Sequence, residues 1–330
     1  ISNMDQYDVV ALGELLIDFT ENGKSLQGNM IMEANPGGAP CNVLSMLSRL
    51  GKKTAFIGKI GNDIFGSQLE KALHEVGIDT KGLKRDDTVN TTLAFVHTKK
   101  DGDREFSFYR NPGADMMLEK SDLEEDILKR CKIFHFGSLS MTHKLCREAT
   151  EKAVSIAESN GAVISFDPNL RSVLWNDIEE ARRQIKYGLR HCNILKISDN
   201  EIQWLAGESN YDRAVEKIQA KFNIPMILLS MGKSGSRVYM GELRVEQPAY
   251  IQKNTIETTG AGDTFCACIL YFVLEYGWRN YQREELDRIL VFANAAASII
   301  TTRKGALRVM PSKSEIENLI AQNDIKSYKY

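Results

Sequence analysis

From residue 133 onward, short apolar runs alternate with longer helix-like stretches, and this alternation restricts the possible folds more than any other feature of the sequence. Four apolar runs have the length of buried strands: 133–136, 163–166, 194–197 and 227–230. Four longer stretches have the pattern of helices: 145–159, 177–190, 262–276 and 283–301. Parallel strands are joined by crossover connections, which are usually helices. The order therefore predicts an α/β fold in which helices cover both faces of a mostly parallel sheet.

The first 110 residues follow the same order but contain two segments that do not fit it. The expected regular elements are a strand at 9–19, a helix at 40–50, a strand at 54–60 and a helix at 65–76. Segment 20–35 is polar, and segment 91–110 holds two strand-like runs around the turn pair Asp101-Gly102. We expect these two segments to form a small β-sheet over one edge of the main sheet. Residues 4–330 would then be a single domain.

Charge and composition exclude several classes of partner. The chain has 330 residues, 43% of them hydrophobic, and a formal net charge of −2. A balance this close to neutral does not draw a chain to nucleic acid or to a membrane surface, so local groups must hold any anionic ligand. The sequence contains neither an apolar run long enough to span a bilayer nor a signal peptide.

Cysteine usage indicates a reducing compartment. The six cysteines include no CxxC pair, which favours free thiols over disulfides or zinc ligands. We therefore expect a soluble, cytoplasmic protein. Met4 is the expected natural start, and residues 1–3 are expected to be additions ahead of it.

The segment 257–265 carries the strongest indication of chemistry. Gly260, Ala261 and Gly262 lead into an apolar helix-like stretch, and the two glycines let the backbone approach a ligand closely. N–H groups at a helix start lack intrahelical partners and carry partial positive charge, so they suit the oxygens of a phosphoryl group. Asp263 is ionised at neutral pH and can take a proton from an attacking hydroxyl. Phosphoryl transfer needs little more than these two features.

The same residues have a simpler interpretation, because aspartate commonly caps helices and glycine is common in turns. A bare GxGD string would favour the cap, whereas the longer string together with Gly37 and Gly38 upstream favours a phosphoryl site. Two other nucleotide motifs are excluded. Residues 232–234 resemble the end of a P-loop, but the glycine required five residues earlier is Ile227. No GxGxxG string follows the first strand.

Motifs spread over the chain resemble the ribokinase-like family of carbohydrate kinases, and within it the bacterial fructokinases. Residues 36–43, PGGAPCNV, are similar to the family's N-terminal signature, and residues 258–265, TTGAGDTF, to its C-terminal signature. Residues 108–115, FYRNPGAD, and residues 165–171, SFDPNLR, with Trp175 are similar to the fructokinase branch. The resemblance runs from residue 8 to about residue 311. It implies a Rossmann-like α/β core with a β-sheet lid over the sugar site.

The resemblance also implies roles for individual residues. Asp263 would be the general base, and the N–H groups of Gly260, Ala261 and Gly262 would form the anion hole. The sugar would contact Asp18, Gly37, Gly38 and Asn42, with Arg110 and Arg171 as further candidates. Taken singly, such residues also occur at strand ends, turns, helix starts and surface ion pairs.

Nucleotide and cation sites are implied as well. ATP would contact Ser230, Gly232, Gly235 and Asn294, although Asn294 could equally be an interhelical polar contact. Glu201 would orient Mg²⁺ through water; the asparagine that the family has three residues earlier is Ser198 here. A K⁺ site would be built mostly from backbone near Glu257 and Thr259 and in the loop of Ile300, Arg303 and Gly305. Glu257 stands where the family usually has aspartate.

The expected reaction is the transfer of phosphate from ATP to D-fructose, giving fructose 6-phosphate. A second hypothesis is a kinase for 2-keto-3-deoxygluconate or another sugar of the family, since Arg110 and Arg171 could hold a carboxylate bidentately. A third, from a different class, is an inactive sugar-sensing homologue, which a lost base or a broken glycine pair would mark. Neither mark is present. Exposed edges of the small sheet also predict a homodimer.

Overall fold

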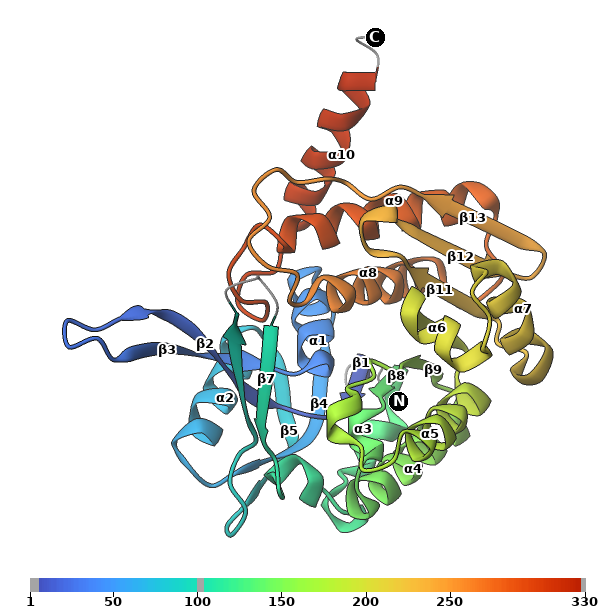
Figure 1. The fold of residues 1–330 in the computed structure, drawn as a ribbon. Helices are drawn as coiled ribbons and strands as arrows, with labels where there is room; N and C mark the ends of the chain where they lie inside the picture. The colour runs from blue at the N-terminus through green and yellow to red at the C-terminus, as the bar shows by residue number, and fades with distance from the viewer. Residues whose placement is uncertain (1–5, 100–103, 328–330) are drawn as a thin grey trace.

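The protein is built around a nine-stranded sheet in a computed structural model that describes residues 6–99 and 104–327 (Figure 1). The strand order is β13-β12-β11-β10-β9-β8-β1-β4-β5. The seven strands from β11 to β5 pair in parallel, and β12 and β13 add an antiparallel edge. The bounds are β1 Tyr7–Leu12, β4 Thr54–Gly61, β5 Ile78–Asp86, β8 Cys131–Gly137, β9 Val163–Asp167, β10 Ile194–Ser198, β11 Met226–Ser230, β12 Ser236–Met240 and β13 Leu243–Gln247. The predicted mostly parallel sheet is confirmed.

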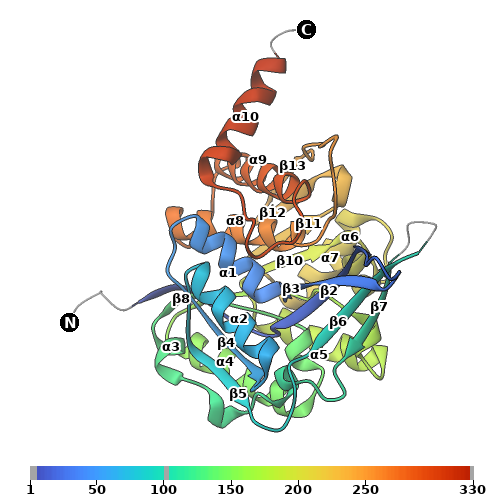
Figure 2. The same cartoon turned by 90° about the vertical axis from the view of Figure 1, so that its left-hand side faces the viewer.

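Helices cover both faces of this sheet (Figures 1 and 2). One face carries α1 Ala39–Arg49, α2 Ile64–Glu75, α8 Ala261–Tyr276, α9 Arg283–Ile300 and α10 Lys313–Ser327. The other carries α3 Glu125–Lys129, α4 Lys144–Ser159, α5 Ile178–His191, α6 Asp199–Ala206 and α7 Tyr211–Phe222. Alternate residues of β1 enter the two cores, with Val9 in one and Val10 in the other. Strands buried on both faces explain the continuous apolar runs in the sequence.

A second, four-stranded sheet has the order β3-β2-β6-β7, with bounds β2 Leu16–Lys24, β3 Met30–Gly37, β6 Leu93–Thr98 and β7 Arg104–Tyr109. The small sheet contains both segments that did not fit the alternation. Strands β6 and β7 pair antiparallel as expected, while the predicted turn at Asp101-Gly102 lies outside the described residues. In Figure 1 the β2–β3 hairpin extends away from the rest of the molecule.

The prediction of one strand at 9–19 was wrong, because the run contains β1 and β2 in two different sheets. The chain leaves the main sheet at Gly13, where a Cβ atom would lie 2.6 Å from Cγ of Pro40. The sequence is apolar on both sides of this bend, because the first residues of β2 are buried as well. Within the described part of the chain, every helix is too short or too polar to cross a bilayer.

Candidate active site

The small sheet and the carboxyl-end loops of the main sheet enclose a cavity of about 840 Å³. Its lining includes most of the predicted catalytic, sugar and cation residues: Asp18, Gly37, Gly38, Asn42, Arg171, Glu257, Thr259, Gly260, Gly262, Asp263 and Gly305. These residues come from segments more than 200 positions apart in the chain. The structure therefore brings the two predicted signatures together in one place.

Asp263 lies in the first turn of α8 and faces the cavity. The side-chain amide of Asn42 donates a hydrogen bond to Asp263 Oδ2 at 3.0 Å. Desolvation by burial raises the pKa of Asp263 to about 6, while the Asn42 hydrogen bond and the cations Lys196 and Arg171 oppose that rise and Asp167 adds to it. A carboxylate with a pKa near 6 is ionised at neutral pH and is a stronger base than an exposed aspartate.

The backbone at the start of α8 is shaped by its glycines. Gly260 has a φ of 81°, and a Cβ there would lie 2.7 Å from Cβ of Ala306. The Ala261 N–H, predicted to belong to the anion hole, donates to the Thr258 carbonyl at 3.2 Å in this structure. Among the described residues, no hydrogen bond occupies the N–H groups of Gly262 and Asp263. The Gly260 N–H likewise has no partner among these residues, so this helix start presents three free donors, two of them predicted members of the anion hole.

Asp18 and the glycine pair belong to one structural unit. Asp18 lies on β2 and Gly37 on the antiparallel strand β3, where a Cβ would come within 2.2 Å of Asp18 Oδ2. Gly38 has a φ of 122°, and a Cβ there would lie 2.5 Å from the Glu14 carbonyl oxygen. Burial raises the pKa of Asp18 to about 6, with Arg171 lowering it and Glu257 raising it further. Glycine at 37 thus leaves room for the Asp18 carboxylate, and glycine at 38 permits the close approach to the Glu14 backbone.

Asn42 is placed by the start of α1. Its amide nitrogen bonds Asp263, but its Oδ1 atom is buried without a hydrogen-bond partner among the described residues. Glu14, which the sequence analysis missed, accepts a hydrogen bond from the Ala39 N–H at 3.0 Å and so anchors the first turn of α1. Burial raises the pKa of Glu14 to about 7. A carboxylate inside the apolar run at 9–19 was the signal that could have identified it.

Lys196 was missed in the same way. It lies on β10, only 8% exposed, and lines the cavity beside Gly262. Its Nζ atom is 3.3 Å from Oδ2 of the buried Asp167 at the end of β9. A lysine inside the apolar run at 194–197 was the available signal.

Arg110 is not a cavity residue, and the structure corrects its predicted role. Its buried guanidinium pairs with Asp115 at 2.9 Å and donates further to Thr142 Oγ1 and the Leu139 carbonyl. The side chain is thus engaged within the protein, behind the cavity wall that Leu139 forms. Arg171, by contrast, is exposed and lines the cavity.

The predicted nucleotide residues lie apart from this cavity. Ser230 ends β11, and Gly232 and Gly235, with φ values of 56° and 98°, shape the turn into β12. The side chain of Asn294 connects α9 to the antiparallel edge of the sheet through hydrogen bonds. Its Oδ1 accepts from Ser236 Oγ at 2.8 Å, and its Nδ2 donates to the carbonyls of Gln247 and Pro248. Its amide is therefore engaged within the protein, and the interpretation of Asn294 as an internal polar contact fits the structure better than an adenine contact.

Glu201 positions the loop that follows β9. Its Oε1 accepts hydrogen bonds from the Ser198 N–H and Oγ, and its Oε2 accepts from the Leu170 N–H at 2.8 Å. Ser198, at the position where an asparagine was expected, serves as the N-cap of α6. The Glu201 carboxylate holds Leu170 and thereby the adjacent Arg171.

The two loops predicted to hold K⁺ do meet. Glu257 Oε1 accepts a hydrogen bond from the Gly305 N–H at 2.5 Å, and the Ile256 and Glu257 amides bond the Thr301 carbonyl. The Ile300 carbonyl accepts from the Arg303 N–H at 3.1 Å, while the Arg303 side chain bonds Glu315 and the Val309 carbonyl, outside the cavity. The part of the chain that the structure describes holds no cluster of three or more His, Cys, Asp or Glu side chains suited to a metal.

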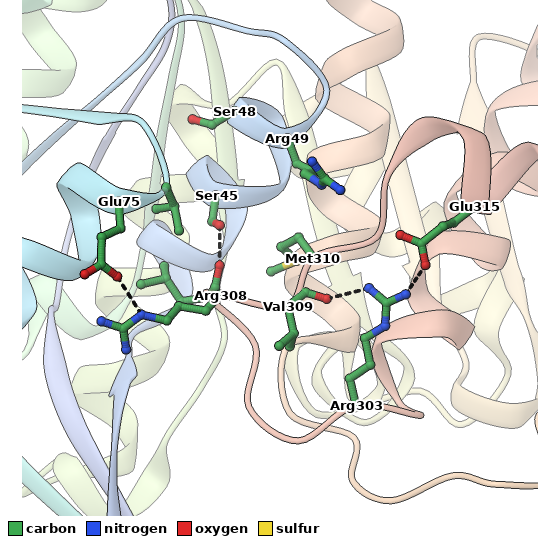
Figure 3. Close-up of a pocket in the computed structure, with 11 residues that line it drawn as sticks. Ser45, Ser48, Arg49, Glu75, Arg303, Arg308, Val309, Met310 and Glu315 are labelled. Carbon is green, nitrogen blue, oxygen red and sulfur yellow. Dashed lines mark hydrogen bonds and ion pairs between the residues drawn. The ribbon is translucent and has the colours of Figure 1, made fainter.

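A second cavity, of about 600 Å³, is lined by residues of α1, the end of α2 and the segment 303–310 (Figure 3). Three arginines line it, but Arg308 pairs with Glu75 at 3.0 Å and Arg303 pairs with Glu315. Among the described residues only Arg49 lacks an ion-pair partner in this lining. Its charges are therefore nearly balanced, unlike those of a site built for a phosphate group.

Comparisons with known proteins agree with the geometry of the larger cavity. The sequence matches the pfkB family of carbohydrate kinases over residues 6–313. A probable fructokinase-2 from Arabidopsis thaliana is 40% identical over 309 residues, which are 93% of this chain and 94% of that protein. The structure of a fructokinase from Xylella fastidiosa with bound ATP has a TM-score of 0.87 and 29% identity, covering 96% of this chain and 99% of that one.

A second solved structure is a fructokinase double mutant from Vibrio cholerae with fructose, ADP and potassium ion bound. It has a TM-score of 0.84 at 27% identity and covers 96% of this chain and 99% of that one. The family match includes both glycine signatures and the whole lining of the larger cavity. The chain therefore belongs to the pfkB family of carbohydrate kinases.

Proposed function

We propose that this chain transfers the γ-phosphoryl group of ATP to a hydroxyl group of D-fructose, giving fructose 6-phosphate and ADP. The observation that carries the proposal is the arrangement at the start of α8, where the Asp263 carboxylate and two free backbone N–H groups face one cavity. Fructokinases among the relatives and the solved structures support fructose as the sugar.

The chemistry follows from the positions of these groups. The Asp263 carboxylate takes the proton of the sugar hydroxyl as its oxygen forms a bond to the γ-phosphorus. The bond from that phosphorus to the bridging oxygen breaks, and its electron pair stays on the β-phosphate of ADP. The N–H groups of Gly262 and Asp263, at the positive end of the α8 dipole, stabilise the transferred group.

Asp18, Asn42 and Arg171 are the side chains that we assign to the sugar. Asp18 offers two acceptor oxygens to neighbouring hydroxyls, and the unpartnered Oδ1 of Asn42 can accept from a hydroxyl near Asp263. The small sheet forms one wall of the cavity, and we propose that it acts as a lid that excludes water during transfer. Only one of the two arginines expected to clamp a sugar carboxylate lines this cavity, which favours fructose over 2-keto-3-deoxygluconate.

Cations complete the proposal. Mg²⁺ would accompany the ATP phosphates and neutralise part of their charge. Glu201 fits a role through Mg²⁺-bound water, because its carboxylate has further acceptor capacity beside the bonds it makes to the protein. For K⁺, the junction of the loops at Glu257 and Gly305 fits a backbone-lined site next to α8.

We also propose a homodimer in the cytoplasm. The β2–β3 hairpin, which projects from the body, exposes Leu26, Met30 and Ile31, and β3 is an edge strand of the small sheet (Figure 1). Open edges and apolar side chains together favour pairing with a second copy. The six cysteines are buried and free, which suits a reducing compartment.

The test is an ADP-release assay with fructose, 2-keto-3-deoxygluconate, ribose and a nucleoside, on the wild type and on Asp263→Asn. We expect fructose to give the highest kcat/KM. Asp263→Asn keeps the shape of the side chain but cannot accept the proton, so kcat should fall by about 10²-fold or more while fructose and ATP still bind. Near wild-type turnover of Asp263→Asn would remove Asp263 from this role, and a preference for the keto-acid would reassign the sugar.

A further inference from the structure

Lys196 is a buried cation in the wall of the cavity to which the sequence motifs assign no role. It sits on β10, next to β9 in the main sheet, and its side chain reaches the cavity beside the start of α8. Its Nζ atom lies only 2.9 Å from where a Cβ on Gly262 would be. A side chain at 262 would therefore displace the ammonium group, and glycine leaves it in place.

The ammonium group has spare hydrogen-bonding capacity. It carries three N–H donors, and within the described residues its one ion-pair partner is Asp167 at 3.3 Å. Asp167 is itself held in place, since it is 3% exposed and its other oxygen accepts from the Asn169 N–H at 3.2 Å. A buried lysine fixed by a buried aspartate on the neighbouring strand is pre-organised, because little side-chain freedom remains to be lost on binding.

Two sources of positive charge thus meet at Gly262, the free N–H groups of α8 and the Lys196 ammonium. We propose that Lys196 contacts the γ-phosphoryl group during transfer as a catalytic residue, and that Asp167 is the residue that positions it. This inference rests on the proposed phosphoryl transfer but not on the identity of the sugar. A fixed positive charge on a buried side chain is the type of group that stabilises negative charge developing on the transferred phosphoryl oxygens.

The surrounding charges agree with a permanently ionised Lys196. Burial alone lowers the pKa of Lys196, but the carboxylates of Asp167, Glu201 and Asp263 outweigh it and raise the pKa above its ordinary value. Lys196 in turn helps to keep Asp263 ionised. Within the described residues, the titratable or charged groups that interact with Asp263 or Lys196 are Glu14 before β2, His135 on β8, Asp167 on β9, Arg171 after β9, Glu201 on α6 and Cys266 on α8.

The main competing role is structural, in which Lys196 only neutralises Asp167. Lys196→Met alone leaves Asp167 unpaired and could unfold the chain, so the decisive variant is the double substitution Lys196→Met with Asp167→Asn. That variant is neutral and close in volume to the original pair. If Lys196 acts on the phosphoryl group, we expect kcat to stay about 10²-fold or more below wild type, with the KM for the sugar changed only a few-fold. Wild-type kcat in the folded double variant would overturn the proposal.

The pH profile gives an independent readout. In Lys196→Met the acid limb of kcat should move to higher pH, since Asp263 loses a nearby cation, whereas in the double variant it should not, because the Asp167 charge that raises the pKa of Asp263 is lost as well. Lys59→Met is the matched control, because Lys59 is similarly buried and paired with Asp122 at 2.9 Å but lies outside the cavity lining. Lys59→Met should lower the melting temperature without moving the acid limb; an equal shift in this control would contradict the assignment.

Binding of ADP with aluminium fluoride, which imitates the transferred phosphoryl group, separates this proposal from the proposed function. We expect the double variant to bind ADP alone like wild type, but to lose about 10-fold or more in affinity for the ADP–aluminium fluoride complex in the presence of Mg²⁺. Equal affinities of wild type and variant for that complex would exclude the contact. If no sugar in the panel is phosphorylated by wild type, the proposed function fails, and this binding measurement still decides the role of Lys196.

Discussion

At the scale of single residues, the hydrogen bond from Asn42 to Asp263 affects the pH range of the reaction, because it lowers the pKa of the Asp263 carboxyl group. The free base must be ionised, and its pKa of about 6 lies well above that of an exposed aspartate. Activity should therefore be lost as pH falls through about 6, rather than through about 4. The Asn42 amide donates to the ionised form and so lowers the pKa of Asp263.

Asn42→Ala should move this acid limb to higher pH, because the ionised form loses a hydrogen bond, and should raise the KM for fructose, because Oδ1 is lost as well. The shift is measured as the pH at half-maximal kcat from pH 5 to 8. Asn35→Ala is the control, since Asn35 lines the same cavity and bonds Thr20 but makes no bond to Asp263. An unchanged acid limb in Asn42→Ala would show that the pair does not form.

Individual residues also show which parts of the site could be predicted from the sequence and which could not. Asp263, Asn42 and Asp18 could be placed because their neighbours form recognisable strings. Glu14 and Lys196 could not, because each is a lone charge inside an apolar run, and only the fold shows that one anchors α1 and the other faces α8. Arg110 was misplaced for the opposite reason: its partner Asp115 is close in sequence, but burial of the pair depends on the segment around Leu139 and Thr142.

The small sheet is the element whose geometry most limits substitution. Gly37 on β3 lies against the side chain of Asp18 on β2, whose register partner is Asn35, and Gly38 passes against the backbone of Glu14 before α1 begins. The sequence predicted the pair β6–β7 and placed segment 20–35 in the same sheet, but it did not predict where β2 starts, since apolar periodicity does not record a change of sheet at Gly13. The close approach of Pro40 that fixes this bend comes from a segment 27 residues away in sequence.

Gly37→Ala should raise the KM for fructose by about 10-fold or more, because the added methyl group would collide with Oδ2 of Asp18. Gly23→Ala in the same sheet is the control: Gly23 has a φ of 78° but open space around its Cβ position, so it should cost only about 1 kcal/mol of stability. Thermal unfolding and sugar kinetics on both variants separate strain from displacement of Asp18. Equal KM values in the two variants would contradict the role of Gly37.

At the scale of the whole molecule, the alternation of strands and helices was enough to predict the doubly covered sheet, because every crossover helix must return over one face or the other. It could not predict the antiparallel edge β12–β13, a short hairpin that lies beyond the last parallel strand. Nor could it predict that the β2–β3 hairpin would extend so far from the body with its apolar residues exposed (Figure 1).

Light scattering after gel filtration should give about twice the chain mass of 37.1 kDa, if two copies associate through this hairpin. Leu26→Asp with Ile31→Asp should shift the protein to monomer, since charges replace the exposed apolar contacts. Ile251→Asp, at an equally exposed apolar residue outside the hairpin, should leave the mass unchanged. A monomeric wild type at micromolar concentration would rule out the dimer.

Asp263, the proposed base, lies on α8, and its hydrogen-bond partner Asn42 lies on α1, 221 residues away in sequence. During synthesis on the ribosome, the residues that we assign to the sugar on β2 and α1 are therefore translated long before the proposed base. A nascent or truncated chain that ends before α8 contains Asp18 and Asn42 but has no means of transfer. Under the proposed mechanism, catalytic competence depends on the last quarter of the polypeptide, where α8 lies.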